Sequence, residues 1–323
     1  MQQPDIFAPD LDFEITALEI FRLQARENLV YQNYLQQIRI DISSIQKVEQ
    51  IPYLPIRMFK SHRVIAGSNE VSTIFTSSGT TGAVTSSHFV TDVALYEQSF
   101  TKTFKKLYGD LSSCCFIALL PSYLERSGSS LVYMCEKLMG ESKHPDSGFY
   151  LNEYDKLAGV IKQLEEKKQK TILLGVTYAL LDFAKLHPMP LRNTIVLETG
   201  GMKGKREEMI RSEVHAILQQ AFSIEAIHSE YGMTELLSQA YSDGNGIYKC
   251  PPWMRVFARD TNDPLSVVSA GKSGGLNIID LANFNSCSFI ATQDLGRIHL
   301  NGSFEVLGRF DDAEIRGCNL MVE

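Results

Sequence analysis

The 323-residue sequence lacks the features that mark nucleic-acid-binding and membrane-spanning proteins. Basic residues are not in excess: 31 Lys and Arg stand against 38 Asp and Glu, and the net charge of −7 argues against binding to a phosphate backbone. The longest apolar stretch, TILLGVTYALLDFA, is interrupted by Thr177, Tyr178 and Asp182, so it is too short and too polar to cross a bilayer. The acidic N-terminus lacks the basic-then-apolar order of a signal peptide. We therefore expect a cytoplasmic protein that has no membrane span and binds no nucleic acid.

Cysteine and the common catalytic signatures are also sparse. The six cysteines show no CxxC pair and no regular spacing, and a chain of this length can bury a core without disulfides, so we expect reduced thiols. There is no G-x-S-x-G hydrolase elbow, and AGKSGG fails the phosphate-binding P-loop pattern because Ser266 stands where its first glycine belongs. The seven histidines have no metal-ligand spacing, and we expect most of them to be structural or exposed.

What is present is an alternation of strand-like and helical segments. Apolar periodicity predicts a helix over residues 12–38, with Ile15, Leu18, Phe21, Ala25 and Leu29 on one face, and two prolines predict an extended segment over 51–64. From about residue 71 the alternation predicts βαβ units and mostly parallel sheets with flanking helices. The expected strands are 71–78, 113–122, 170–177, 193–200 and 223–232, and the expected helices are 93–109, 129–140, 178–186 and 205–222.

After residue 246 the pattern changes to short apolar runs separated by Gly, Asn and Asp. These runs predict antiparallel strands, and LNGSF at residues 300–304 predicts a hairpin turn. We expect two domains. Residues 1–246 would form an α/β core with an N-terminal helical segment, and residues 247–323 would form a smaller β-rich subdomain ending in a short tail.

The segment FTSSGTTG, residues 75–82, follows a predicted strand and is rich in hydroxyls and glycine. Ligands of α/β sheets bind at the carboxyl ends of strands, and glycines let backbone amides approach an anion. The segment therefore predicts a polyphosphate site, although a solvated strand–helix loop would have a similar composition. The candidate residues are Thr76, Ser77, Ser78, Gly79, Thr80, Thr81 and Gly82.

A second candidate segment, HSEYGMTE, also follows a predicted strand. Tyr231 could stack on a base, Thr234 could bond a phosphate oxygen, and Glu235 could hold Mg²⁺, which favours carboxylate and phosphate oxygens. Alternatively, Thr234 and Glu235 could simply begin a helix. Asp294 in TQDLGRI and Arg309 in LGRFDDAEIRG could bond sugar hydroxyls and phosphate, although each taken singly would suit a surface charge.

Taken together, the ordered segments FTSSGTTG, ETGGMKG, YGMTE, TQD and GRFDD resemble the core motifs of adenylate-forming enzymes across residues 71–317. The segments IPYLPIRMFKS, YLERSGSSLVYM and GGMKGKRE are similar to the LuxE branch, the acyl-protein synthetases of bacterial fatty acid reductase systems. The resemblance implies the N-terminal-domain fold of that superfamily. It also implies that the full C-terminal lid is lacking, because little sequence follows GRFDD.

The resemblance implies a role for each matching residue. Residues 76–82 would wrap the phosphates of ATP, Gly200 and Gly201 would lie along the adenine, and Tyr231 with Gly232 would lie on its other face. Thr234 would contact the α-phosphate, Glu235 would bind Mg²⁺, and Asp294 and Arg309 would hold the ribose. The usual lysine after the second loop glycine is missing, so Lys203, or its neighbours Lys205 and Arg206, would supply the cation.

The resemblance also implies the reaction. A fatty or other carboxylic acid would be converted to acyl-AMP and passed to a thiol, with an acyl-CoA-type reductase as a possible partner. The thiol would be Cys318, placed near the C-terminus as in LuxE-type enzymes, although a small buried cysteine would also fit that position. Two alternatives stay open: a non-catalytic adenylate-binding or assembly subunit, and a short CoA ligase of the phenylacetate type.

Overall fold

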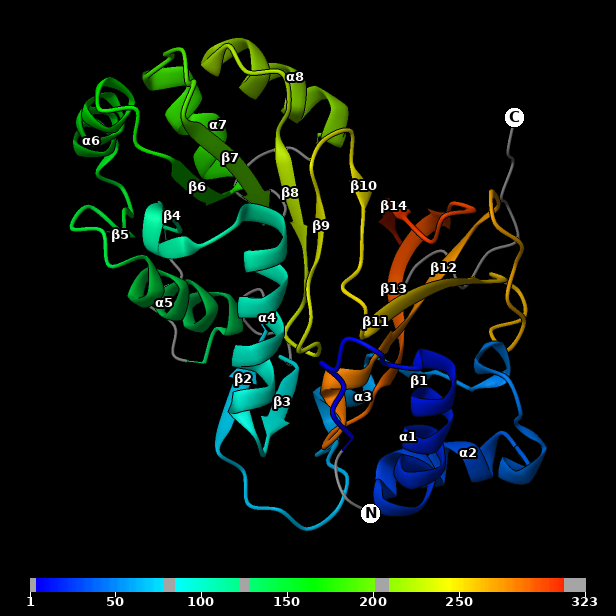
Figure 1. Ribbon diagram of the computed structural model, residues 1–323. Coiled ribbons are helices and arrows are strands. Elements are labelled where there is room, and N and C mark those ends of the chain that lie inside the picture. Colours follow the sequence, from blue (N-terminus) through cyan, green and yellow to red (C-terminus); the bar gives the residue numbers. More distant parts are fainter. Residues whose placement is uncertain (1–3, 78–84, 122–127, 201–208, 311–323) are drawn as a thin grey trace.

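The computed structural model describes residues 4–77, 85–121, 128–200 and 209–310, and it has an α/β architecture (Figure 1). One six-stranded sheet, here called the α/β sheet, has the order β5-β4-β6-β7-β8-β9. Strands β5 to β8 pair in parallel, and β9 is antiparallel to β8. Its strands are β4 (Cys115–Leu119), β5 (Gly148–Phe149), β6 (Thr171–Val176), β7 (Thr194–Thr199), β8 (His228–Tyr231) and β9 (Ala240–Ser242).

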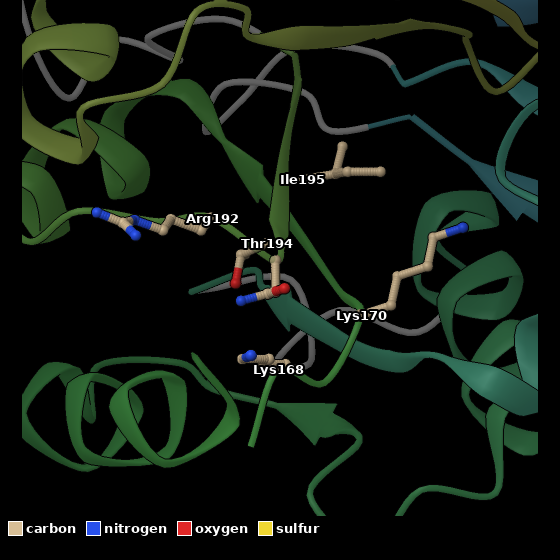
Figure 2. Close-up of a pocket in the computed structure, with 6 residues that line it drawn as sticks. Lys168, Lys170, Arg192, Thr194 and Ile195 are labelled. Carbon is tan, nitrogen blue, oxygen red and sulfur yellow. The ribbon is translucent and has the colours of Figure 1, made fainter. Parts of the chain in front are cut away.

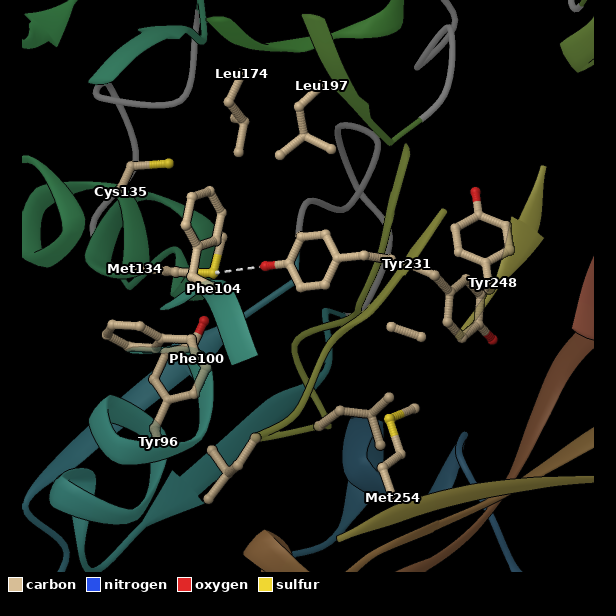
Figure 3. Close-up of a cluster of buried hydrophobic side chains, with 14 of the residues drawn as sticks. Tyr96, Phe100, Phe104, Met134, Cys135, Leu174, Leu197, Tyr231, Tyr248 and Met254 are labelled. Atoms are coloured by element: carbon tan, nitrogen blue, oxygen red, sulfur yellow. Dashed lines mark hydrogen bonds between the residues drawn. The ribbon is translucent and has the colours of Figure 1, made fainter. Parts of the chain in front are cut away.

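Helices cover both faces of the α/β sheet. On one face lie α4 (Val93–Tyr108) and α5 (Ser130–Ser142), and on the other lie α6 (Tyr154–Glu166), α7 (Thr177–Leu186) and α8 (Arg211–Phe222) (Figure 1). Every residue of β4 and β6 is buried, as expected for strands covered on both sides. Figure 3 shows part of this core, with Tyr96, Phe100 and Phe104 of α4 near Met134 and Cys135 of α5.

Side-chain caps mark the starts of two of these helices. The Asp92 side chain accepts a hydrogen bond from the Ala94 amide at 3.0 Å, and the Ser129 side chain accepts one from the Val132 amide at 3.3 Å. Each cap satisfies one of the amides that a first helical turn leaves without an intrahelical partner. The predicted start of α4 at residue 93 is therefore correct, whereas α8, predicted from residue 205, begins at Arg211.

The second six-stranded sheet, here called the antiparallel sheet, is antiparallel except for one added strand. Its order is β10-β14-β13-β12-β11, and β1 pairs with β13 in parallel. The sequence indicated separate runs on either side of Leu295, but β13 is one ten-residue strand with a bulge between Leu295 and Gly296. The predicted turn near residue 301 is confirmed by the bond from the His299 amide to the Ser303 carbonyl. The strands are β1 (Leu54–Pro55), β10 (Ile247–Tyr248), β11 (Met254–Arg259), β12 (Ser273–Asp280), β13 (Phe289–Ile298) and β14 (Phe304–Arg309).

The N-terminal helix differs from its prediction. It divides into α1 (Phe13–Glu27) and α2 (Leu29–Gln37), because Asn28 adopts an extended conformation and caps α2 through the Tyr31 amide. The break ends the 3.6-residue register, and Leu29, expected on the buried face, is 66% exposed. Ile15 was also wrongly placed on that face, since it lies exposed near the start of α1.

Long-range polar contacts attach this helical segment to the connection between β12 and β13. The side-chain amide of Gln24 donates to the backbone carbonyls of Asn283 and Phe284, and the side-chain amide of Asn28 donates to the Ser286 carbonyl. The segment expected to be extended does contain β1 but then makes one helical turn, α3 (Met58–Ser61). Single 3₁₀ turns complete the described elements: η1 (Ile42–Ser44), η2 (Val48–Gln50), η3 (Leu111–Ser113) and η4 (Leu281–Asn283). The division at residue 246 stays a prediction.

The strand that leads into the hydroxyl-rich segment is not part of the α/β sheet. β2 (Thr73–Thr76) pairs antiparallel with β3 (Ser87–Val90) in a separate two-stranded sheet, here called the β2–β3 hairpin. The expectation that residues 75–82 follow a strand of the parallel sheet was therefore wrong. Residues 87–90 alternate between half-buried and buried positions, as in a strand with one covered face.

Two further expectations concern helices and thiols. Across the described ranges, no helix combines the length and apolar composition needed to cross a bilayer. The five cysteines within those ranges are unpaired, and all except the half-buried Cys250 are buried. Burial raises the pKa of Cys115 to about 11 and that of Cys287 to about 12. These thiols are therefore protonated and shielded at neutral pH.

Candidate functional site

Tyr231, Asp294 and Arg309 form a bonded cluster where the α/β sheet meets the antiparallel sheet. The hydroxyl of Tyr231, the last residue of β8, donates to Asp294 Oδ2 at 2.7 Å. Asp294 lies opposite Arg309 in the β13–β14 register, and Arg309 Nε is 3.3 Å from Asp294 Oδ1. Three residues predicted from three separate motifs are thus brought together at one place.

The charge of this cluster is open to solvent on one side only. Burial raises the pKa of Asp294, while the Tyr231 hydrogen bond and the charges of Arg309 and Arg259 act in the opposite direction. Arg259 is held from inside by its bond to the Thr292 carbonyl, whereas the Arg309 side chain is 71% exposed. A carboxylate beside an outward guanidinium offers an acceptor for hydroxyls and a cation for an anion.

The ring of Tyr231 is largely covered by neighbouring aromatic side chains. It meets Phe304 edge-on at 5.3 Å between ring centroids and lies 5.7 Å from Tyr248, and the residue is 8% exposed. Figure 3 shows Tyr231 and Tyr248 side by side. Little of the ring is open to a ligand in this structure, so stacking of Tyr231 on an adenine stays a prediction.

Residues 232–239 form a turn that connects β8 to β9, here called the 232–239 turn. No helix begins at Thr234 or Glu235, so the alternative that they open a helix was wrong. The Leu236 amide bonds the Met233 carbonyl, and side chains from other elements hold the next carbonyls. His88 Nδ1 lies 2.9 Å from the Thr234 carbonyl oxygen, and the Asn283 amide donates to the Glu235 carbonyl at 2.8 Å.

The Glu235 carboxyl group is buried against the base of the β2–β3 hairpin. Burial raises its pKa, although a hydrogen bond with the Ser86 side chain and the charges of Arg309 and Lys60 act in the opposite direction. Ser86 in turn pairs with Ser77: the Ser77 amide bonds the Ser86 carbonyl at 3.0 Å, and the Ser86 amide bonds Ser77 Oγ at 2.9 Å. Ser86 therefore joins Glu235 to the start of the hydroxyl-rich segment.

Steric fit explains two glycines around these residues. A Cβ at Gly232 would lie 2.3 Å from Glu230 Oε1, so a larger residue there would have to displace the Glu230 side chain. A Cβ at Gly128, whose φ is +86°, would lie 2.9 Å from Thr76 Oγ1. The Thr76 amide also bonds the Gly128 carbonyl at 2.7 Å. Thr76 is thus packed against residue 128, and both glycines permit close approach.

Gly200, at the end of β7, is fixed by a network that the sequence did not reveal. Its φ is +71°, and its carbonyl accepts a 2.9 Å bond from Thr177 Oγ1, which also lies 2.9 Å from Glu198 Oε2. Burial raises the pKa of Glu198, but the hydrogen bond with His215 and the charge of Arg211 outweigh it and hold the pKa below its ordinary value. Glu198 therefore stays ionised and anchors the strand end beside Gly200.

In a comparison with protein-family models, residues 150–323 match the family described as "Acyl-protein synthetase, LuxE". The matched segment covers more than half of the chain and includes Tyr231, Asp294 and Arg309. The chain belongs to the LuxE acyl-protein synthetase family. No curated protein matches its sequence.

Solved structures share the fold of this LuxE-family chain at low sequence identity. ATP-bound MatB from Rhodopseudomonas palustris is 17% identical, with a TM-score of 0.57 over 75% of this chain and 49% of that one. An open conformation of 2-hydroxyisobutyryl-CoA ligase in complex with 2-HIB-AMP and CoA is 11% identical, with a TM-score of 0.66 over 92% of this chain and 69% of that one. The chain thus spans about half the length of the MatB structure, and at these identities the likeness shows the fold alone.

Several predicted positions of the LuxE-family chain lie outside the described residues. They are Ser78, Gly79, Thr80, Thr81, Gly82, Gly201, Lys203, Lys205, Arg206 and Cys318. The sequence also missed residues that organise the site, namely Ser86, His88 and Glu198. His88 had been grouped with the unpatterned histidines, and only its place in a strand beside the hydroxyl-rich run could have singled it out.

The carboxylates near the site would fit a metal ion that is coordinated partly by the protein and partly by a bound ligand. Among the described residues, no group of three or more His, Cys, Asp and Glu side chains converges as an all-protein metal site would require. Glu235 is a single carboxylate beside the hydroxyl-rich segment. That donor set fits Mg²⁺, which commonly takes one or two carboxylates and completes its shell with water and phosphate oxygens.

A basic pocket of about 320 Å³ lies at the amino-terminal ends of the α/β-sheet strands, away from the candidate site (Figure 2). Lys168, Lys170 and Arg192 line it, at the amino-terminal ends of β6 and β7. Gly200 and Tyr231 lie at the carboxyl ends of β7 and β8. The basic pocket is therefore separate from the candidate site.

Proposed function

We propose that this LuxE-family chain activates a carboxylic acid with ATP and transfers the acyl group to a thiol. A carboxylate oxygen attacks the α-phosphorus, the bond to the β-phosphate oxygen breaks, and pyrophosphate leaves behind an acyl-AMP. A thiolate sulfur then attacks the acyl carbon, AMP leaves, and a thioester forms. The protein's part is to hold the nucleotide and to stabilise the charge that develops on the phosphates.

The observation that carries this proposal is the meeting of the Tyr231–Asp294–Arg309 cluster with the 232–239 turn. Asp294 would accept from ribose hydroxyls, and the exposed Arg309 guanidinium would bond ribose or phosphate oxygens. Gly200 and Gly201 would lie along the adenine. The fold supports the proposal because it is shared with MatB, solved with ATP, and with 2-hydroxyisobutyryl-CoA ligase, solved with 2-HIB-AMP and CoA.

The phosphate and metal part of the site would be built from residues 76–82 with Thr234 and Glu235. Ser86 joins the Glu235 carboxylate to Ser77, so a metal ion bound there would lie beside the hydroxyl-rich segment. When bound, Mg²⁺ would neutralise charge on the leaving pyrophosphate. Lys203 would add the cation that this segment itself does not contain.

For the acyl acceptor we propose Cys318, the sixth residue from the end of this sequence. Arg316 lies two residues earlier and would favour the thiolate. Burial raises the pKa of four described cysteines, which makes them poor acceptors: Cys115, Cys135, Cys250 and Cys287. In keeping with the family, we propose a fatty acid as substrate, an acyl-CoA-type reductase as partner, and a cytoplasmic location.

The test is carboxylate-dependent exchange of labelled pyrophosphate into ATP over a panel of carboxylic acids. We expect exchange with fatty acids and a dependence on Mg²⁺. Nucleotide binding without exchange for any acid would contradict the proposal and favour a non-catalytic binding subunit. Acyl transfer to CoA in place of the protein would favour a short CoA ligase of the phenylacetate type.

A further inference from the structure

His88 links two parts of the site that are far apart in the sequence. It lies on β3, the strand that follows residues 78–84, and its Nδ1 is 2.9 Å from the carbonyl oxygen of Thr234. A carbonyl oxygen can only accept, so Nδ1 carries the proton and donates. The bond therefore ties the β2–β3 hairpin to the 232–239 turn.

Packing alone does not explain a histidine at this position. The residue is 0% exposed, its ring meets Phe59 edge-on at 5.6 Å, and it faces the same side of the hairpin as its register partner Phe75. Its other ring nitrogen, Nε2, is buried and has no hydrogen-bond partner among the described residues. Burial lowers the pKa of His88 to about 4, so the ring is neutral at neutral pH. A hydrocarbon ring would fill the same space without a buried unpaired nitrogen, so the Nδ1 bond is the distinguishing feature.

The Thr234 bond lies in a wider set of contacts that fixes the turn from two sides. From the hairpin side, the Ser86 side chain bonds the Glu235 carboxyl group. From the antiparallel-sheet side, Asn283 bonds the Glu235 carbonyl, and Asp280 accepts from the Leu237 amide at 2.8 Å. Asn283 and Asp280 bond backbone atoms of the turn from the antiparallel-sheet side, and Ser86 bonds a side chain of the turn. Among these described contacts, His88 is therefore the side chain that ties the backbone of the turn to the hairpin.

We propose that His88 is a positioning residue of the nucleotide site, which sets the Thr234–Glu235 backbone at a fixed distance from the strand that follows the hydroxyl-rich segment. The inference rests on the proposed function, which assigns phosphate and metal binding to the hydroxyl-rich segment together with Thr234 and Glu235. His88 acts through Thr234 and touches neither ATP nor metal. Its loss should weaken Mg²⁺–ATP binding more than binding of metal-free ATP, because the carboxylate that would hold the metal would no longer face the phosphates.

The test compares His88→Asn with His88→Gln. The amide nitrogen of Asn occupies nearly the place of Nδ1 and can keep the bond to Thr234, whereas that of Gln reaches the place of Nε2 and cannot. Both variants bury one amide, which matches their polarity. Tyr31→Phe serves as the control, because it deletes another buried bond from a side chain to a carbonyl, that of Pro52, outside the proposed site.

ATP affinity is measured by titration calorimetry with Mg²⁺ and with a chelator, after thermal melts have shown which variants are folded. We expect His88→Gln to weaken Mg²⁺–ATP about tenfold, or about 1.4 kcal/mol, and metal-free ATP less than threefold. His88→Asn and Tyr31→Phe should both stay within threefold of wild type. If His88→Gln does not fold, His88→Leu replaces it with the same expectation.

Three results would overturn the assignment. They are a folded His88→Gln variant with wild-type Mg²⁺–ATP affinity, an equal loss with and without metal, and an Asn variant that loses as much as Gln. The readout is binding, so it stays decisive if wild type binds Mg²⁺–ATP but shows no exchange, a result that would count against the proposed function alone. A wild-type protein that binds no nucleotide would overturn both.

Discussion

Replacing Asp294 is the most direct test of how the two sheets build the site. In Asp294→Ala the buried Tyr231 hydroxyl loses its acceptor, which costs about 1–3 kcal/mol. The lost pair with Arg309 adds little, about 0–1 kcal/mol, because that guanidinium is 71% exposed. We expect the free energy of unfolding to fall by about 2 kcal/mol, which for 323 residues lowers Tm by about 3 °C.

The expected effect on ATP is larger than this stability change would suggest. A hydrogen bond to a charged acceptor contributes about 1.5–3 kcal/mol, so losing the ribose contact should raise the Kd for ATP by roughly 10- to 150-fold. The KM for the carboxylic acid should change less than threefold, because the acid does not contact Asp294 in the proposed site. Pyrophosphate exchange measured at varied ATP and at varied acid separates the two effects.

Asp294→Asn is the matched control for charge. It keeps an acceptor oxygen for Tyr231 and removes the charge that faces Arg309, so Tm should stay within about 1 °C of wild type while ATP binding weakens by about tenfold or less. Two results would refute the reasoning: equal loss for ATP and acid in the folded alanine variant, or unchanged ATP affinity in that variant.

Three further predictions concern the metal, the acyl acceptor and a buried acid. Glu235→Gln replaces a charged ligand with a neutral amide and should raise the Mg²⁺ concentration for half-maximal exchange several-fold, and an unchanged Mg²⁺ titration would remove Glu235 from the metal site. Cys318→Ser should abolish hydroxylamine-sensitive labelling of the protein by labelled fatty acid with ATP and leave exchange intact, so label that persists would reject Cys318 as acceptor. Burial raises the pKa of Asp280 from 3.8 to about 6, so the folded state binds this proton more tightly than the unfolded state. The unfolding free energy of wild type relative to Asp280→Asn should therefore fall by up to about 3 kcal/mol as pH rises from about 4 through 6, and urea unfolding that shows a constant difference would contradict this.

The sequence motifs predicted the residues of the candidate site better than the residues that hold them in place. Tyr231, Asp294 and Arg309 were chosen from separate segments, and the structure bonds them to one another. That succeeded because each motif has its own side-chain chemistry, which can be read locally. His88 and Ser86 escaped notice because their importance lies in partners about 150 residues away.

Secondary structure was predicted best where one local signal dominated. The helix start at residue 93 and the turn at residues 299–303 are set by neighbouring residues, and both predictions are confirmed. The predicted helix over residues 12–38 failed at Asn28, whose amide bonds the Ser286 carbonyl across the fold. Asn28 also caps α2 through the Tyr31 amide, so a local preference and a distant partner act together to end the helix there.

The sequence by itself determined the βαβ alternation, the β-rich segment after residue 246 and the family, because hydrophobic period and motif order are properties of the chain. Only the tertiary structure decided that β2 pairs with β3 outside the α/β sheet, that Thr234 and Glu235 lie in a turn, and that Tyr231 bonds Asp294. These outcomes depend on which buried polar groups find partners once the two sheets are packed together. A buried donor or acceptor is costly unless it is paired, and its partner is chosen by the whole fold.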